Sequence, residues 1–115
     1  MTVVQTKEFT WDYSERSDIV NIHRTGRKVK ESTELGDFTV DFDAEGNIIG
    51  IEIMNVNSFL KEAGISQSEL TQLQSAELIV TQGKANVTYI WIKFMFPHHI
   101  EKKIPIPVPV MMEAM

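Results

Sequence analysis

The stretch that decides the fold is Asp37-Phe-Thr-Val-Asp-Phe-Asp-Ala-Glu-Gly-Asn-Ile-Ile-Gly-Ile-Glu-Ile53. Apolar and polar residues alternate in both of its halves, and turn-forming residues fill positions 44–47. A period of two on both sides of a glycine-containing turn predicts a β-hairpin. One register places every large apolar side chain on the same face, and it pairs Phe42 with Ile49, Val40 with Ile51, and Phe38 with Ile53.

Two more hairpins are predicted around this one. The first joins residues 9–13 to residues 18–23. The third joins residues 76–80 to residues 87–91 through a two-residue turn at Gly83-Lys84, where glycine suits a type II′ turn. Residues 29–35 form a short connector to which the pattern assigns no regular structure.

The segment between the second and third hairpins changes from a strand period to a helical one. Asn57 or Ser58 is expected to cap a short helix that Gly64 ends. Ser66 and Glu69 have the spacing of a capping box, which predicts the start of a second short helix. These helices can cover one face of the sheet.

The strand that ends the third hairpin is apolar on both faces. Residues 89–96 alternate two apolar sets, and residues 104–110 place proline at every second position. Because proline cannot donate to a ladder, this last segment is predicted as an edge strand or strap. Either this proline segment or another subunit must cover the second apolar face of the strand. We expect a homodimer, and its interface candidates are Ile90, Ile92, Phe94, Phe96, Ile104, Ile106 and Val108.

The elements together predict an α+β fold. It has about six strands in antiparallel hairpins, as one sheet or two layers, with one or two short helices between the second and third hairpins. One domain is expected over residues 1–115, divided into a core at 9–60, a helix and third hairpin at 61–96, and a proline-rich edge strand and tail at 97–115. The predicted core residues are Phe9, Trp11, Val20, Ile22, Phe38, Val40, Phe42, Ile49, Ile51, Ile53, Leu60, Leu78, Val80, Tyr89 and Trp91.

Composition narrows the possible functions. The chain has 115 residues, 43% of them apolar, which suffices for a folded core. Its net charge of −5 argues against nucleic acid or an anionic membrane as the main partner. The lack of cysteine excludes disulfides, thiolate catalysis and thiolate metal sites. No apolar run has the length of a signal peptide or a membrane span, so a cytoplasmic location is expected.

Several segments together resemble the YuzE-like family. They are Asp12-Tyr13, Asp18-Ile-Val-Asn-Ile22, Glu31-Ser-Thr-Glu-Leu-Gly36, Val40-Asp-Phe-Asp43, and above all Gly46-Asn-Ile-Ile-Gly-Ile-Glu-Ile53 with Asn57-Ser58 after it. The family consists of small prokaryotic proteins of the DUF2283 class, a domain of unknown function, and residues after 60 resemble its longer, archaeal-looking members. The resemblance covers residues 9–60 and implies a small α+β fold with an antiparallel sheet. Through toxin-like neighbouring genes of some members it also implies an antitoxin or accessory role, and it implies no catalytic residue.

The acidic hairpin offers the main catalytic candidates. Asp41 and Glu52 are predicted on its outer face, where two carboxylates could bind a divalent cation or act as an acid and base, with His23 as a further group. The competing interpretation, which we favour, is a solvated polar face. We expect no divalent-ion binding tighter than about millimolar, because the neighbouring sequence offers few further ligands.

Other clusters are weaker as sites. The turn at 43–47 resembles a calcium loop but lacks the acids at alternate positions that such a loop needs. His98 and His99, with Glu101 nearby, would point to opposite faces of a strand. The basic segment 24–30 has no aromatic residues among its charges, so a solvated loop is favoured. No motif predicts a cofactor.

Two functions follow from these features. The first is a non-catalytic interaction protein, antitoxin-like or accessory, with a second small protein as its partner. The alternative is a metal-dependent hydrolase that uses Asp41 and Glu52.

Overall fold

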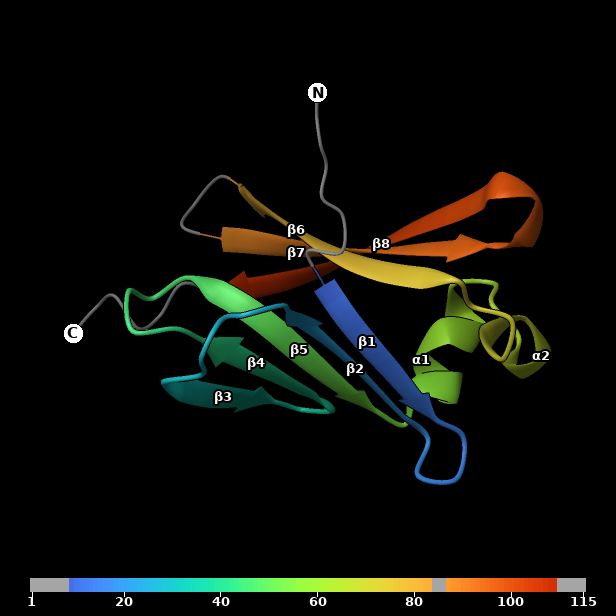
Figure 1. Ribbon diagram of the computed structural model, residues 1–115, viewed down its shortest axis with the longest axis horizontal. Helices are drawn as coiled ribbons and strands as arrows, with labels where there is room; N and C mark the ends of the chain where they lie inside the picture. Colours follow the sequence, from blue (N-terminus) through green and yellow to red (C-terminus); the bar gives the residue numbers. More distant parts are fainter. Residues whose placement is uncertain (1–8, 84–86, 110–115) are drawn as a thin grey trace.

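The computed structural model describes residues 9–83 and 87–109, which form two antiparallel sheets (Figure 1). The larger sheet has the order β1-β2-β5-β4-β3 and the smaller one the order β6-β7-β8. The strands are β1 Phe9–Ser14, β2 Ile19–Arg24, β3 Glu31–Leu35, β4 Phe38–Phe42, β5 Ile48–Met54, β6 Ser75–Gln82, β7 Val87–Phe96 and β8 Ile100–Pro109. The helices are α1 Val56–Glu62, α2 Gln67–Leu70 and the short 3-10 helix η1 Pro97–His99.

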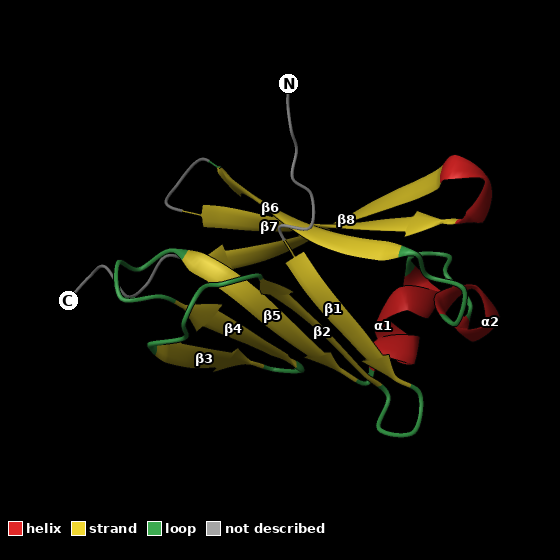
Figure 2. Ribbon diagram, in the orientation of Figure 1, coloured by secondary structure: helices red, strands yellow, loops and turns green. Residues whose placement is uncertain are grey.

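The two sheets pack face to face, and α1 and α2 lie together at one end of them (Figure 2). Alternate residues of both sheets point into one shared core, which also takes in the apolar sides of α1 and α2. The protein is thus mainly antiparallel β with two short helices, as the predicted α+β class requires in broad terms. The helices lie between β5 and β6. The unpredicted strand β3 forms a hairpin of its own with β4, so β4–β5 is the third hairpin of the structure. The helices therefore follow the third hairpin instead of lying between the second and the third.

The register of the hairpin β4–β5 is confirmed over most of its length. Phe38 pairs with Ile53 and Val40 with Ile51, but Phe42 pairs with Ile48 instead of Ile49. A bulge between residues 41 and 42 absorbs the difference. The turn causes this shift in register. The backbone amide of residue 43 donates to the carbonyl of residue 47, so the turn is one residue shorter than the predicted register requires.

Strand β3 occupies part of the segment that the sequence left as a connector. It pairs with β4 along its length and forms an edge of the larger sheet. Thr33 and Leu35 are half-buried, and the other three residues are exposed. An edge strand with so little apolar surface has no clear period of two, so its sequence did not predict it.

The predicted pairing of the third hairpin is wrong. Val80 pairs with Ile90 and Leu78 with Ile92, three positions away from the predicted register. The amide of Gly83 donates to the carbonyl of Val87 at 2.7 Å, so the loop between them is longer than two residues. The predicted turn residue Lys84 lies outside the described residues.

This shift exchanges the two faces of β7. The inner residues of β7 are Ile90, Ile92, Phe94 and Phe96, each at most 4% exposed. Tyr89 and Trp91, predicted as core, lie half-buried on the outer face, and Val80 is 43% exposed.

The interface candidates on β7 therefore pack inside the chain, against the larger sheet. The same holds for Ile106 and Val108, which are buried, and Ile104 is half-buried. The homodimer stays a prediction, but these side chains no longer provide its reason.

The proline segment forms the predicted edge strand. Within the described residues strand β8 pairs with β7 alone, and Pro105 and Pro107 are exposed while Ile106 and Val108 are buried. Consecutive residues of a strand point their amide groups to opposite sides, so alternate prolines all fall on the unpaired side. The free edge of β8 thus lacks the donors that another strand would need.

The cap of α1 comes from a distant turn and not from Asn57 or Ser58. The carboxylate of Asp18 accepts the backbone amide of Asn57 at 3.1 Å and its side-chain amide at 2.7 Å. Asn55 at the N-cap position makes no side-chain capping bond. The predicted capping box of Ser66 and Glu69 does begin α2. No helix in the described part of the chain is long and apolar enough to cross a membrane.

We expect Asp18→Ala to lower the free energy of unfolding by about 1 kcal/mol, the usual cost of losing an N-cap. Urea unfolding followed by circular dichroism measures this change. Asp12→Ala, an exposed acid of the adjacent strand β1, is the matched control and should change stability by less than about 0.5 kcal/mol. Equal effects of the two substitutions would show that the cap contributes nothing.

Candidate functional site

One polar row crosses the outer face of the larger sheet. His23 on β2 and Asp41 on β4 are both paired with Gly50 on the strand between them. Ser32 on β3 stands next in the row, and its hydroxyl donates to Asp41 at 2.6 Å. The pairing of Val40 with Ile51 already implied that Asp41 lies opposite Gly50. It did not imply that His23 would lie on the other side of the same glycine.

Gly50 allows these side chains to lean over its backbone. A Cβ atom there would lie 2.9 Å from Cδ2 of His23 and 3.1 Å from Oδ2 of Asp41. Both distances are shorter than ordinary contacts, so a larger residue would push the two side chains apart. The row is therefore packed around the glycine.

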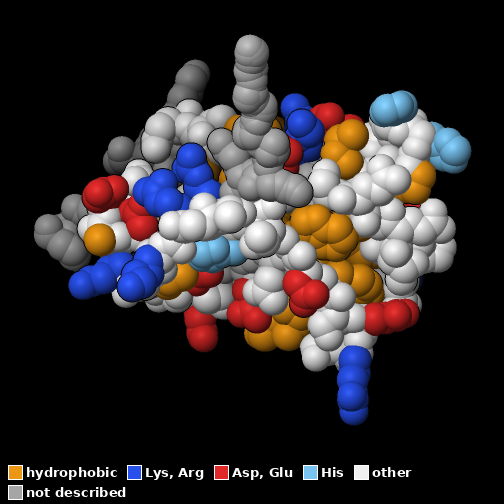
Figure 3. All heavy atoms as spheres, viewed as in Figure 1, with side chains coloured by type: hydrophobic (Ala, Val, Ile, Leu, Met, Phe, Trp, Pro, Cys, Tyr) orange, Lys and Arg blue, Asp and Glu red, His pale blue; other side chains and the backbone are white. Residues whose placement is uncertain are grey.

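Glu52 belongs to the next row and has polar neighbours, Asn21 and Thr39. Figure 3 shows acidic side chains spread over this side of the molecule instead of converging at one point. Within residues 9–83 and 87–109, no group of three His, Cys, Asp or Glu side chains could hold a metal ion. The hydrolase alternative, which needed Asp41 and Glu52 to act together, gains no support from this geometry.

The turn that resembled a calcium loop is occupied by protein donors. The carboxylate of Asp43 accepts the backbone amides of Glu45 and Asn47, each at 2.9 Å, and forms an ion pair with Arg27. The hydrogen bond from the backbone of Asn47 is the main reason that the pKa of Asp43 lies below its usual value of 3.8, with smaller contributions from the Asn47 side chain, Glu45 and Arg27. Asp43 thus holds the turn, and Arg27 ties the basic segment to it.

The lowered pKa of Asp43 predicts a pH dependence of stability. Because the folded pKa lies below the unfolded value, the stabilisation is complete above about pH 4 and is lost as the pH falls through the folded value. Asp43→Asn should therefore lower the melting temperature at pH 7, and the difference from the wild type should shrink toward pH 3. Differential scanning calorimetry at both pH values checks this, and a difference independent of pH would contradict it.

The histidine pair lies in a turn and not in a strand. His98 and His99 have positive φ angles of 67° and 60° in the connection from β7 to β8, and both are exposed. Figure 3 shows histidine side chains projecting at that end of the molecule, far from the polar row. Glu101 pairs instead with Lys93 and Lys103 on the smaller sheet.

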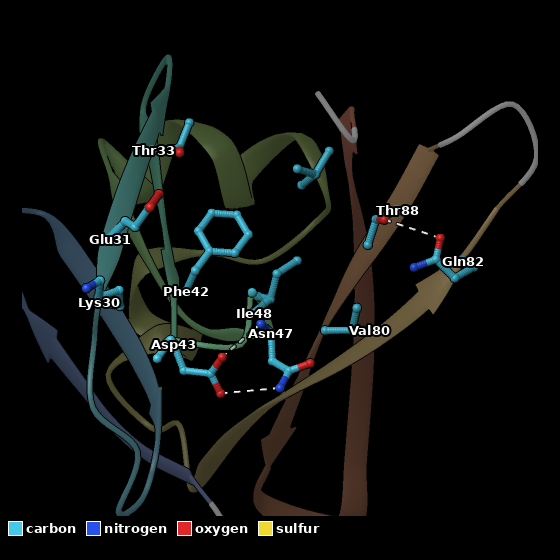
Figure 4. A pocket seen from close by; sticks show the side chains of 13 residues that line it. Lys30, Glu31, Thr33, Phe42, Asp43, Asn47, Ile48, Val80, Gln82 and Thr88 are labelled. Atoms are coloured by element: carbon cyan, nitrogen blue, oxygen red, sulfur yellow. Dashed lines mark hydrogen bonds between the residues drawn. The ribbon is translucent and has the colours of Figure 1, made fainter. Parts of the chain in front are cut away.

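A cleft of about 540 Å³ opens where the two sheets diverge, away from the helices (Figure 4). Its apolar wall is formed by Phe42, Ile48, Val80 and Val108. Such a volume is typical of small-molecule sites. Its polar groups are already partly paired, however: the side-chain amide of Asn47 donates to Asp43 at 3.3 Å, and Thr88 donates to Gln82 at 3.5 Å.

The outer face of the smaller sheet carries a surface that includes Tyr89 and Trp91, two residues predicted in the core. Five side chains form it, and we call it the aromatic face: Ile79, Tyr89, Trp91, Pro105 and Pro107. Trp91 lies between Ile79 and Pro105 across the three strands, and Tyr89 stands beside Pro107. Ile79 is 38% exposed, both prolines are exposed, and the two rings are half-buried. One sequence signal could have identified this surface. The even-numbered residues 90–96 of β7 are all large and apolar, and when they are buried, Tyr89 and Trp91 must lie on the outer face.

Fold and site together describe a small, mainly β protein with two packed sheets, a polar row on the outer face of the larger sheet and the aromatic face on the outer face of the smaller one. Residues 11–57 match the model of a family described as a protein of unknown function, DUF2283. The predicted resemblance to this family is therefore confirmed for residues 11–57 of the chain. A protein of Methanocaldococcus jannaschii with the name "Uncharacterized protein MJ0789" is 37% identical over 46 residues, which are 40% of this chain and 40% of that protein. No solved structure matches the chain.

The matched segment has a clear place in the structure. It contains most of β1, all of β2 to β5 and the start of α1. Most of the larger sheet thus lies within the matched segment, while β6, β7 and β8 lie outside it. The aromatic face is built entirely by the part that the family model does not cover.

Proposed function

We propose that this protein is a non-catalytic interaction protein that binds another polypeptide on its aromatic face. The observation that carries the proposal is that Tyr89 and Trp91 lie side by side, only half-buried, on the outer face of the middle strand of a sheet. Tyrosine and tryptophan are the residues that most often dominate binding energy at protein interfaces. An accessory or antitoxin-like role toward a second small protein is the form of this function that the resemblance implies.

The two faces of the molecule support this choice of surface. The outer face of the larger sheet is polar and acidic, so it offers little apolar area to a partner. The aromatic face combines apolar side chains with a rim of charged residues, which is the usual anatomy of a contact surface. Because this face lies on the smaller sheet, a partner bound there would not cover the outer face of the larger sheet, which residues 11–57 mostly form.

The test is purification of the tagged protein from its native host, followed by identification of what remains bound. Trp91→Ala should lose the partner that the wild type retains, because it removes the central ring of the face. Glu52→Gln, on the outer face of the larger sheet, is the matched control and should retain it. Retention by Trp91→Ala, or loss by both variants, would refute the aromatic face as the contact surface.

A further inference from the structure

We propose that the segment bound on the aromatic face is proline-rich and adopts the polyproline II conformation. This inference rests on the proposed function and names the chemistry of its partner. Its starting point is the pair of rings on β7. The centroids of Tyr89 and Trp91 lie 6.5 Å apart, and the ring planes are inclined by 37°. Two neighbouring rings offer flat apolar surfaces on one strand, and aromatic side chains are what recognition domains use to bind the pre-formed, low-entropy polyproline II helix.

Both rings are held in place before anything binds. The indole Nε1–H of Trp91 donates to Oγ1 of Thr81 at 3.1 Å. The ring of Tyr89 lies against Gly83, where a Cβ atom would come within 2.6 Å of its Cε2 atom. Gly83 therefore provides the space that the tyrosine ring occupies. Fixed rings lose little side-chain entropy on binding, which favours even a small ligand.

The size of the face favours a narrow, extended occupant. Three strands span about 14 Å, and the two apolar rows extend over about 13 Å along them, so the apolar area is on the order of 200 Å². A stable interface between folded proteins takes about 800 Å² of total surface from each partner, of which somewhat more than half is apolar. A second copy of this chain or a folded domain would thus find too little apolar surface here, whereas one extended segment would cover it.

The charges beside the face favour an uncharged segment. Lys93 lies 3.9 Å from both Glu77 and Glu101, and Lys103 lies 3.7 Å from Glu101. Two acids and two bases neutralise one another, so this row presents no net charge to a ligand. The aromatic face thus favours a ligand with uncharged, apolar side chains such as proline rings.

The prolines of β8 determine how a segment must lie. The unpaired edge of β8 lacks amide donors at Pro105 and Pro107, so a segment cannot extend the sheet there as a further strand. It must lie across the face, in contact with side chains. A polyproline II segment suits this position because it has no need to pair its backbone with a strand.

The probe is a blocked peptide of about ten prolines, and a blocked Gly-Ser peptide of the same length is its control. Trp11→Phe leaves Trp91 as the single tryptophan, so its fluorescence reports on the face directly. We expect a saturable change with the proline peptide and none with the Gly-Ser peptide. Tyr89→Leu, which keeps apolar bulk but removes the flat ring, should weaken binding about tenfold. Glu52→Gln should bind as the wild type does.

Each result supports or overturns the inference. Saturation with the predicted loss in Tyr89→Leu, in a variant that circular dichroism shows to be folded, supports it. No saturable binding, equal binding of both peptides, or full affinity in Tyr89→Leu overturns it. Light scattering that shows a dimer lost in Trp91→Ala would make a second copy the occupant and would also overturn it. If the proline peptide fails while the native partner still depends on Trp91, the proposed function stands and only its proline chemistry falls.

Discussion

Val40→Asp is expected to unfold most of the protein. Val40 is fully buried on β4, between Thr33 of β3 and Ile51 of β5. The substitution removes about 2 kcal/mol of apolar burial and places an unpaired charge in the core, which costs several kcal/mol more. The sum is comparable to the whole stability of a typical domain, about 5–15 kcal/mol. Urea unfolding and the dispersion of amide NMR signals would measure the loss.

The control for Val40→Asp is its neighbour in the chain. Asp41 points to the outer face, where it accepts a hydrogen bond from the exposed Ser32. Asp41→Val should change the free energy of unfolding by no more than about 0.5 kcal/mol, as for ordinary surface substitutions. Two adjacent positions of one strand would then differ by several kcal/mol. Similar effects at both positions would mean that the facing of the hairpin is wrong.

The hairpin β4–β5 could be predicted because its two halves constrain one another. Alternation in each strand leaves one register that buries Ile49, Ile51 and Ile53 together, and the pairing of Val40 with Ile51 follows from it. The bulge at residue 42 could not be predicted in this way. It depends on the side chain of Asp43 tightening the turn, and side-chain hydrogen bonds leave no trace in the hydrophobic period.

The third hairpin lacked such a constraint, because β7 is apolar on both faces. Moving the pairing by three positions still matched apolar residues with apolar residues. The choice between the faces depended on which one the larger sheet covers, and that is a matter of tertiary packing. Long-range contacts decided the other misses too. Asp18 caps a helix 39 residues away, and His23 meets Asp41 only because β5 lies between their strands.

Phe94→Ala is expected to have the second largest effect. Phe94 is a large, fully buried side chain on β7, opposite Ala76 of β6, and its ring centroid lies 6.3 Å from that of Phe96. Truncation of a buried phenylalanine costs about 3–5 kcal/mol, because apolar burial is lost and a cavity remains. Here the neighbour on β6 is alanine, which is too small to fill the space. The loss should therefore lie toward the upper end of that range, measured by urea unfolding.

The control for Phe94→Ala tests which face of β7 is inside. Met95 follows Phe94 in the chain and lies half-buried on the outer face, opposite Ser75. Met95→Ala should cost about 1 kcal/mol or less, since only part of its side chain leaves an apolar environment. If Met95→Ala cost as much as Phe94→Ala, the residues of the aromatic face would belong to a second covered layer. A second copy of the chain would then be the first candidate for the layer that covers them. Urea unfolding repeated at several protein concentrations would test this, because the stability of a dimer rises with concentration.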